Sequence, residues 1–235
     1  VLRLYNALIA DDGQQLRYYI QGVGTTSSKV ANSLGWLTGA GADRKSDEAL
    51  KYLISVYHSG DAIYLFGFSR GAAICRDLAN RIGEHFLTGT PNIPLIGLWD
   101  TVAAFGIPCD LIGIPFQETN LGKQLDIPNF VQKTVHLLAI PEDRKAFTPT
   151  LVEAGERVEE VWFTGAHADV GGGFRDRELA DIPLRFMIQR AVAAGLNFNP
   201  QALQAIPVNE HCEGNIHPSK ENFGQAPRSI VVRRN

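Results

Sequence analysis

The chain has 235 residues, of which 45% are hydrophobic, so it can bury one sizeable core in a single large domain. Its formal net charge of −3 provides no basic surface, which argues against nucleic acid as a partner and against a general attraction to anionic membranes. The three cysteines (Cys75, Cys109 and Cys212) are odd in number and lack CxxC spacing, so they argue against a disulfide framework and against a zinc site.

The first part of the chain predicts two helices with a short strand between them. Apolar residues on one face of residues 1–10 indicate a helix, and residues 16–20, "LRYYI", indicate a strand. Residues 21–28, "QGVGTTSS", form a glycine-rich loop that lacks the Gly-Lys-Ser/Thr of a P-loop. Ser46 is expected to cap the next helix, because two acidic residues and then an apolar face follow it.

Four apolar runs predict the strands of a central sheet, namely residues 61–68 ("DAIYLFGF"), 93–100 ("IPLIGLWD"), 133–140 ("KTVHLLAI") and 159–167 ("EEVWFTGAH"). A helical pattern follows the first run and continues through Phe86. A further helix is predicted from Asp181 to the terminating glycine Gly195. Strands that alternate with helices indicate a three-layer α/β fold with a mostly parallel sheet.

Two stretches do not follow these patterns. Residues 105–130 are apolar, rich in proline and glycine, and too long for a simple connection. They suit either a lid or flap that binds an acyl chain or a segment folded down as additional core. After Asn197 the chain is mostly loop-like, with one strand expected at residues 229–232.

The strand of residues 61–68 continues into Gly67-Phe68-Ser69-Arg70-Gly71, which matches the nucleophile-elbow pattern G-x-S-x-G between a strand and a helix. The alternative is an ordinary turn that contains a serine. In a true elbow the serine has a strained backbone, and side chains at Gly67 and Gly71 would collide with the neighbouring strand and helix. The Arg70 N–H, at the helix N-terminus, is then expected to bind an oxyanion.

A catalytic serine needs a base, and the chain has six histidines. Five of them precede the serine, lie inside a helix or strand, or follow no strand: His58, His85, His136, His211 and His217. Only His167 directly follows a predicted strand, and Gly171, Gly172 and Gly173 behind it would let the loop fold tightly over a site. We therefore interpret His167 as the base rather than as a solvated loop histidine.

Two aspartates compete to orient that histidine. Asp100 ends the strand of residues 93–100, although a helix-cap or turn role also fits it. Asp169 lies two residues from His167, which suits a role in holding the loop better than one across the site. Asp100 is preferred. Arg70 and Arg76 are suited either to binding a phosphate headgroup or to facing solvent.

The sequence resembles the catalytic domain of the type VI secretion phospholipase effector family. The similar stretches are "VLRLYNAL", "YLFGFSRGAA", "GLWDTVAAFG", "HLLAIPEDRKAFTPTL", "VWFTGAHADVGGGF" and "ADIPLRFMI", in this order along the chain. The resemblance implies an α/β-hydrolase fold, a Ser-Asp-His triad at Ser69, Asp100 and His167, and hydrolysis of phospholipid acyl esters. The family normally begins with a strand and an Asp-Gly-Thr turn that would supply a second oxyanion N–H, and these are expected upstream of Val1.

Together these features predict a serine hydrolase that cleaves carboxylic esters of lipids through an acyl-enzyme, without a metal or organic cofactor. The second hypothesis is a non-catalytic hydrolase-like module that binds lipid or protein. The expected partners are a lipid or ester substrate and, transiently, a membrane surface. The sequence does not indicate an oligomeric state.

The domain is expected to extend over residues 1–235. The only methionine is Met187, so Val1 is not a translation start, and the resemblance implies that the first strand of the domain lies upstream. No apolar run approaches the roughly 20 residues of a membrane span, and the chain opens on no signal-peptide pattern. We therefore expect synthesis in the cytoplasm, with the resemblance implying export as a secretion-system effector.

Overall fold

The computed structural model describes residues 1–9, 13–20, 39–86, 90–103, 124–140, 149–174, 176–207, 214 and 216. Its elements follow one another as α1 (Leu2–Ala7), α3 (Gly39–Val56), β1 (Ala62–Phe68), α4 (Arg70–His85), β2 (Asn92–Trp99), β3 (Thr134–Ala139), β4 (Val158–Phe163), α5 (His167–Gly171), α6 (Glu178–Ala193) and α7 (Pro200–Gln204). All four strands predicted from the apolar runs are present.

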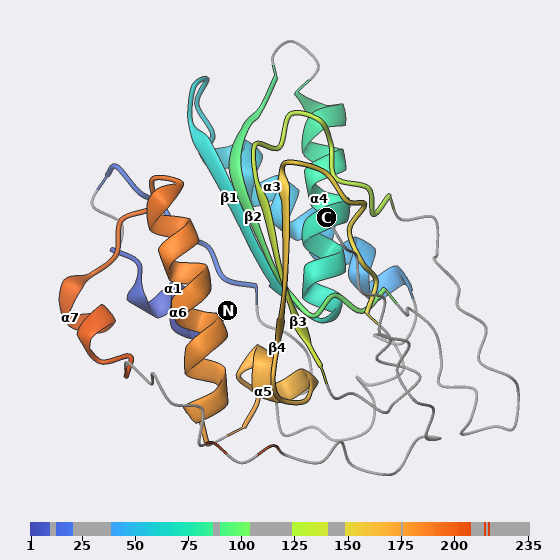
Figure 1. Cartoon of the computed structure of the whole chain (residues 1–235). Coiled ribbons are helices and arrows are strands. Elements are labelled where there is room, and N and C mark those ends of the chain that lie inside the picture. The colour runs from blue at the N-terminus through green and yellow to red at the C-terminus, as the bar shows by residue number, and fades with distance from the viewer. Residues whose placement is uncertain are drawn as a thin grey trace, which may run out of the picture.

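The strands form one parallel sheet in the order β1-β2-β3-β4. Figure 1 shows α3 and α4 on one face of this sheet and α1 and α6 on the other. The α/β fold with a parallel sheet between two helical layers is therefore confirmed. Since the strands are parallel, their carboxyl ends all lie at one edge of the sheet, where open α/β sheets bind their ligands.

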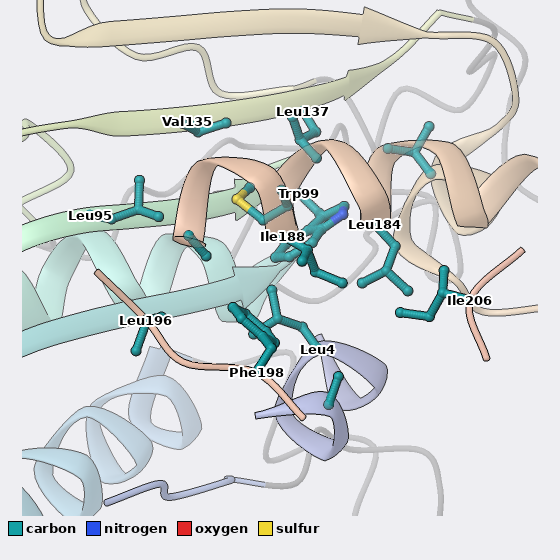
Figure 2. Close-up of a cluster of buried hydrophobic side chains, with 14 of the residues drawn as sticks. Leu4, Leu95, Trp99, Val135, Leu137, Leu184, Ile188, Leu196, Phe198 and Ile206 are labelled. Carbon is teal, nitrogen blue, oxygen red and sulfur yellow. The ribbon is translucent and has the colours of Figure 1, made fainter. Parts of the chain in front are cut away.

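Helices cover both faces of the sheet, and its two inner strands, β2 and β3, are buried almost throughout, which explains why they are continuous apolar runs. On the face covered by α6, the sheet contributes Leu95, Trp99, Val135 and Leu137 to a cluster that also contains Leu4, Met187 and Phe198 (Figure 2). On the opposite face, Ile63, Leu65 and Ile96 of the sheet form a second cluster with Leu78 and Ile82 of α4. Every residue of β3 is buried, so a polar side chain on this strand requires a partner inside the protein.

Two predictions in the first part of the chain were wrong. Residues 16–20 form no strand. Ser46 does not begin a helix but lies inside α3, where its buried hydroxyl donates to Asp77 Oδ2 of α4 at 2.7 Å. The capping pattern around Ser46 was misleading because the serine is instead used for a contact between two helices.

The C-terminal helices also differ from the prediction. Helix α6 begins at Glu178 rather than at Asp181, whose carboxylate pairs with Arg3 of α1. It ends as predicted, with Gly195 in a left-handed conformation at φ 105°. The short helix α7 was not predicted, although Asn199 caps it by accepting from Gln201 and Ala202 N–H groups.

Three predicted features lie outside the described residues: the glycine-rich loop of residues 21–28, all but residues 124–130 of the excursion at 105–130, and the strand at 229–232. The role of residues 105–130 as a lid or flap therefore stays a prediction. Among the described residues, no helix is long and apolar enough to cross a membrane.

Candidate active site

Ser69 lies in the turn between β1 and α4 with a strained backbone, at φ 58° and ψ −124°. The turn is held from both sides, because the Ser69 N–H donates to Trp99 O of β2 at 2.9 Å and the Ser69 carbonyl accepts from Val102 N–H at 3.3 Å. A non-glycine residue adopts such a conformation only when the surrounding structure imposes it, and residues of this kind cluster at functional sites. Ser69 therefore has the strained backbone that the G-x-S-x-G pattern predicts at this turn.

The two glycines beside Ser69 differ in what they allow. A Cβ at Gly67 would lie 2.3 Å from the Gly71 carbonyl oxygen and 2.6 Å from Ala72 N, so the close approach of strand and helix requires glycine there. A Cβ at Gly71 would have no atom within 4 Å among the described residues, and the predicted collision at this position was wrong. Among the described residues, steric need therefore explains a glycine at position 67 but not at position 71.

The structure places Asp100 and His167 against each other. Asp100 follows β2 directly, and its Oδ2 lies 2.8 Å from His167 Nδ1. Both side chains are buried, with relative exposures of 0% and 6%. Because the imidazole Nδ1–H is the group that can donate to a carboxylate at this distance, the pair places the proton of a neutral His167 on Nδ1 and leaves Nε2 as the unprotonated ring nitrogen.

His167 is the first residue of α5, and three contacts position it. The ring lies against the Phe68 ring with centroids 4.5 Å apart, and Phe68 is the residue directly before Ser69. Gly171, one turn later, packs so closely on Phe68 that a Cβ would lie 2.2 Å from the aromatic ring. Asp169 accepts from the Ala166 N–H at 2.9 Å and so caps the start of α5. The candidate base is therefore held between β1 and its own short helix.

A sequence profile identifies the family. The profile of the T6SS phospholipase effector Tle1-like catalytic domain matches residues 1–87 and 79–190. These ranges contain all the described strands as well as Ser69, Asp100 and His167. This chain belongs to the Tle1-like catalytic domain family.

Individual relatives are similar over parts of this Tle1-like domain. The Tle1 effector, in a structure bound to the VgrG spike, is 29% identical with a TM-score of 0.45 over 58% of this chain and 31% of that one. An uncharacterized protein from Pseudomonas aeruginosa is 21% identical with a TM-score of 0.50 over 71% of this chain and 30% of that one, which bears on the fold.

A sequence relative also occurs in a yeast. The uncharacterized protein YEL023C of Saccharomyces cerevisiae is 35% identical over 96 residues, which cover 35% of this chain and 14% of that protein. The Tle1-like domain thus spans less than a third of each of these three relatives.

Two of the other histidines lie away from Asp100 and His167. His58 is exposed before β1, and His85 is in the last turn of α4. His211 and His217 lie outside the described residues. Within those residues, no group of three His, Cys, Asp or Glu side chains could hold a metal ion.

The two arginines considered for a phosphate headgroup are both on α4. Arg76 is 2% exposed and donates to the carbonyl oxygens of Leu125, Thr150 and Leu151, so it holds two segments beside the site and does not face solvent. Burial lowers the pKa of Arg76 to about 10 and also lowers the pKa of Arg70, which begins α4 directly after Ser69.

One buried residue near the site was passed over in the sequence because it lies inside a strand. His136 of β3 is fully buried and bonds to the Thr101 N–H and to Glu160 of β4. Burial lowers its pKa, although the bond to Glu160 opposes this shift. The available signal was the pattern itself, since a histidine inside an otherwise apolar strand must find a hydrogen-bond partner.

Proposed function

We propose that this domain is a serine hydrolase that cleaves acyl esters of phospholipids or other lipids through a covalent acyl-enzyme. Ser69 is the nucleophile, His167 the general base and Asp100 the orienting acid. The observation that carries the proposal is the 2.8 Å contact between Asp100 Oδ2 and His167 Nδ1, at the sheet edge where Ser69 occupies its strained turn. A nucleophile, a base and a buried carboxylate in this order along the chain are the elements of the α/β-hydrolase mechanism.

In the first half-reaction, His167 Nε2 takes the proton of Ser69 Oγ while Oγ forms a bond to the ester carbonyl carbon. The resulting tetrahedral intermediate carries the negative charge on the former carbonyl oxygen. It collapses when the ester C–O bond breaks and His167 transfers its proton to the leaving alcohol. Asp100 stays ionised throughout and stabilises the imidazolium. Water then repeats the sequence on the acyl-enzyme and releases the carboxylic acid.

The oxyanion needs donors that are in place before the reaction. The Arg70 N–H at the start of α4 is the proposed first donor, because it directly follows the nucleophile and lies at the positive end of a 16-residue helix. The second donor is expected from the turn that precedes α1 in the family pattern. Removing one such donor typically lowers the rate by about 10²- to 10³-fold.

The substrate class follows from the family, whose description is that of a phospholipase effector. We extend this to a single catalytic domain at residues 1–235 that meets its substrate at a membrane surface. Export as an effector is a separate part of the proposal. A similar sequence occurs in a yeast, so hydrolysis and delivery through a secretion system need separate tests.

Fluorophosphonate labelling of the full-length protein tests the nucleophile. Labelling is expected in the wild type and in Ser55→Ala, an exposed serine of α3 whose hydroxyl donates to Tyr52 O. Ser69→Ala should abolish it. If labelling does not depend on Ser69, the domain is not a serine hydrolase of this mechanism.

Vesicles of phosphatidylcholine and a short-chain p-nitrophenyl ester, each assayed with wild type and Ser69→Ala, test the substrate class. Release of fatty acid from the vesicles that requires Ser69 supports a phospholipase. Hydrolysis of the short ester alone would contradict the lipid substrate. Binding to vesicles without Ser69-dependent hydrolysis would instead support the non-catalytic lipid-binding module.

A further inference from the structure

His136 lies on β3, directly opposite Glu160 of β4 in the register of the parallel sheet. The ring is 0% exposed. Its Nδ1 lies 3.1 Å from Glu160 Oε1, and its Nε2 lies 3.1 Å from the Thr101 backbone nitrogen. Glu160 Oε1 also accepts from the Val152 N–H at 2.9 Å. Both ring nitrogens thus have a defined partner.

The partners determine the tautomer of His136. A backbone N–H can only donate, so the nitrogen that faces Thr101 must be the unprotonated acceptor. Nδ1 then carries the proton and donates it to Glu160, which accepts as a carboxylate. The charged groups around the ring are Glu160 on β4, Arg76 on α4 and Asp100 after β2. Protonation of Nε2 would place two donors face to face and break the bond to Thr101.

The bond to Thr101 acts on the backbone of Asp100. Asp100 has φ 38°, a left-handed conformation that is strained for a non-glycine residue. Rotation about φ and ψ of Asp100 moves the peptide group before it relative to the peptide group after it. The first of these is bound to β3 by Asp100 N–H donating to Leu137 O at 2.7 Å. The second is bound to β3 by the Thr101 N–H donating to His136.

These two bonds differ in what they require of the sequence. The bond to Leu137 uses only backbone atoms, which any residue provides. The bond to Thr101 requires an acceptor on the side chain at position 136. Because the Cα–Cβ direction of Asp100 follows from its φ and ψ, the two bonds together set the direction of its Cβ. The Ala139 N–H then donates to Asp100 Oδ1 at 3.2 Å, which leaves Oδ2 facing His167.

We propose that His136, in its neutral Nδ1-protonated form, is a positioning residue that fixes the Asp100–Thr101 turn and so keeps the Asp100 carboxylate on His167 Nδ1. This role rests on the proposed function of Asp100 and His167. His136 does not reach the substrate in this mechanism and exchanges no proton with it. Its absence would let the turn relax, and a misplacement of about 1 Å at a catalytic group can lower the rate by about 10²-fold.

Two substitutions separate the two bonds of His136. In His136→Gln the side-chain oxygen reaches the place of Nε2, so the acceptor for Thr101 remains while the donor to Glu160 is lost. In His136→Asn the shorter amide takes the place of Nδ1, so the donor to Glu160 remains while the acceptor for Thr101 is lost. The midpoint of urea unfolding is expected to fall by a similar amount in both variants, because each loses one buried hydrogen bond.

The rates are expected to differ. In His136→Asn, kcat for a short-chain ester should fall by about 10- to 100-fold with little change in KM, and fluorophosphonate labelling of Ser69 should slow in proportion. His136→Gln should retain kcat within a few-fold. Equal losses in the two variants, or full activity in both, would overturn the positioning role.

Nuclear magnetic resonance of protein labelled with 15N-histidine gives a readout independent of turnover. Wild-type His136 should show Nδ1–H and an unprotonated Nε2, and His167 should show an Nδ1–H bonded to a carboxylate. The His167 signal should be lost or altered in His136→Asn and kept in His136→Gln.

A wild-type His136 that carries its proton on Nε2 would overturn the proposal without any variant. So would an unchanged His167 signal in His136→Asn. If instead Ser69 fails to label in the wild type, the proposed hydrolase function fails, while these spectra still report whether His136 positions Asp100.

Discussion

Replacing Asp100 by asparagine is expected to invert the tautomer of His167. Asp100 Oδ1 accepts from the Ala139 N–H at 3.2 Å, and Oδ2 lies 2.8 Å from His167 Nδ1. An asparagine satisfies Ala139 only when its carbonyl oxygen faces that N–H, and its NH₂ group then faces His167. A ring nitrogen that faces an NH₂ donor must be unprotonated, so the proton moves to Nε2. A His167 with the proton on Nε2 cannot accept the proton of Ser69.

The size of the effect follows from the two states of the asparagine. The reversed amide, which retains the active tautomer, faces its NH₂ toward the Ala139 N–H and leaves buried donors unpaired, at about 1–3 kcal/mol. Even in that state the imidazolium loses its carboxylate, a charged hydrogen bond of about 1.5–3 kcal/mol. At about 1.4 kcal/mol per tenfold, the two terms together lower kcat by about 10²- to 10⁴-fold.

Steady-state hydrolysis of a short-chain ester by Asp100→Asn measures this loss, with urea unfolding to verify the fold. The matched control is Asp169→Asn, since Asp169 accepts from the Ala166 N–H at the start of α5. The control should lose about 1 kcal/mol of unfolding free energy or less, and less than about tenfold in kcat, because its amide oxygen still accepts from the Ala166 N–H and only the negative charge at the start of α5 is lost. A loss below about tenfold in Asp100→Asn, or an equal loss in Asp169→Asn, would refute this assignment of the two carboxylates.

Three further predictions concern stability and reactivity. Gly67→Ala should lower the free energy of unfolding in urea by about 1–3 kcal/mol or more, because its Cβ would meet backbone atoms. Gly71→Ala should leave the free energy of unfolding unchanged or raise it slightly. Equal effects of the two substitutions would contradict the contact geometry. Burial raises the pKa of Cys75 to about 12, so native Cys75 should resist iodoacetamide at neutral pH and react only on unfolding, as peptide mass spectrometry would measure. Burial lowers the pKa of His136 from its ordinary value of 6.5, so the unfolded state binds the extra proton and the unfolding free energy should fall as the pH decreases below 6.5. In His136→Gln this part of the decrease should be absent, and identical pH profiles for the two proteins would argue against a neutral buried imidazole.

The sequence alone predicted the architecture because local patterns carried the information. Strands covered by helices on both faces are apolar throughout, and four such runs were recognisable without any knowledge of their neighbours. The turn at Ser69 was recognisable for a similar reason. The strand and the helix approach each other closely there, and this requires glycine at position 67, which is visible in the sequence. The predictions that helices begin at Ser46 and at Asp181 were wrong, because both polar side chains instead make contacts with another helix.

The arrangement of the site depends on tertiary structure. The sequence favoured Asp100 over Asp169 because Asp100 ends a predicted strand, but the contact itself depends on the order of the sheet, in which β3 lies between β2 and β4. Asp169 caps its own helix. His136 was passed over as a strand residue because its partners lie 35 residues before it and 24 residues after it. The physical reason is the same in both cases. A sequence pattern reports whether a side chain is buried, but its hydrogen-bond partner is decided by strand order and register.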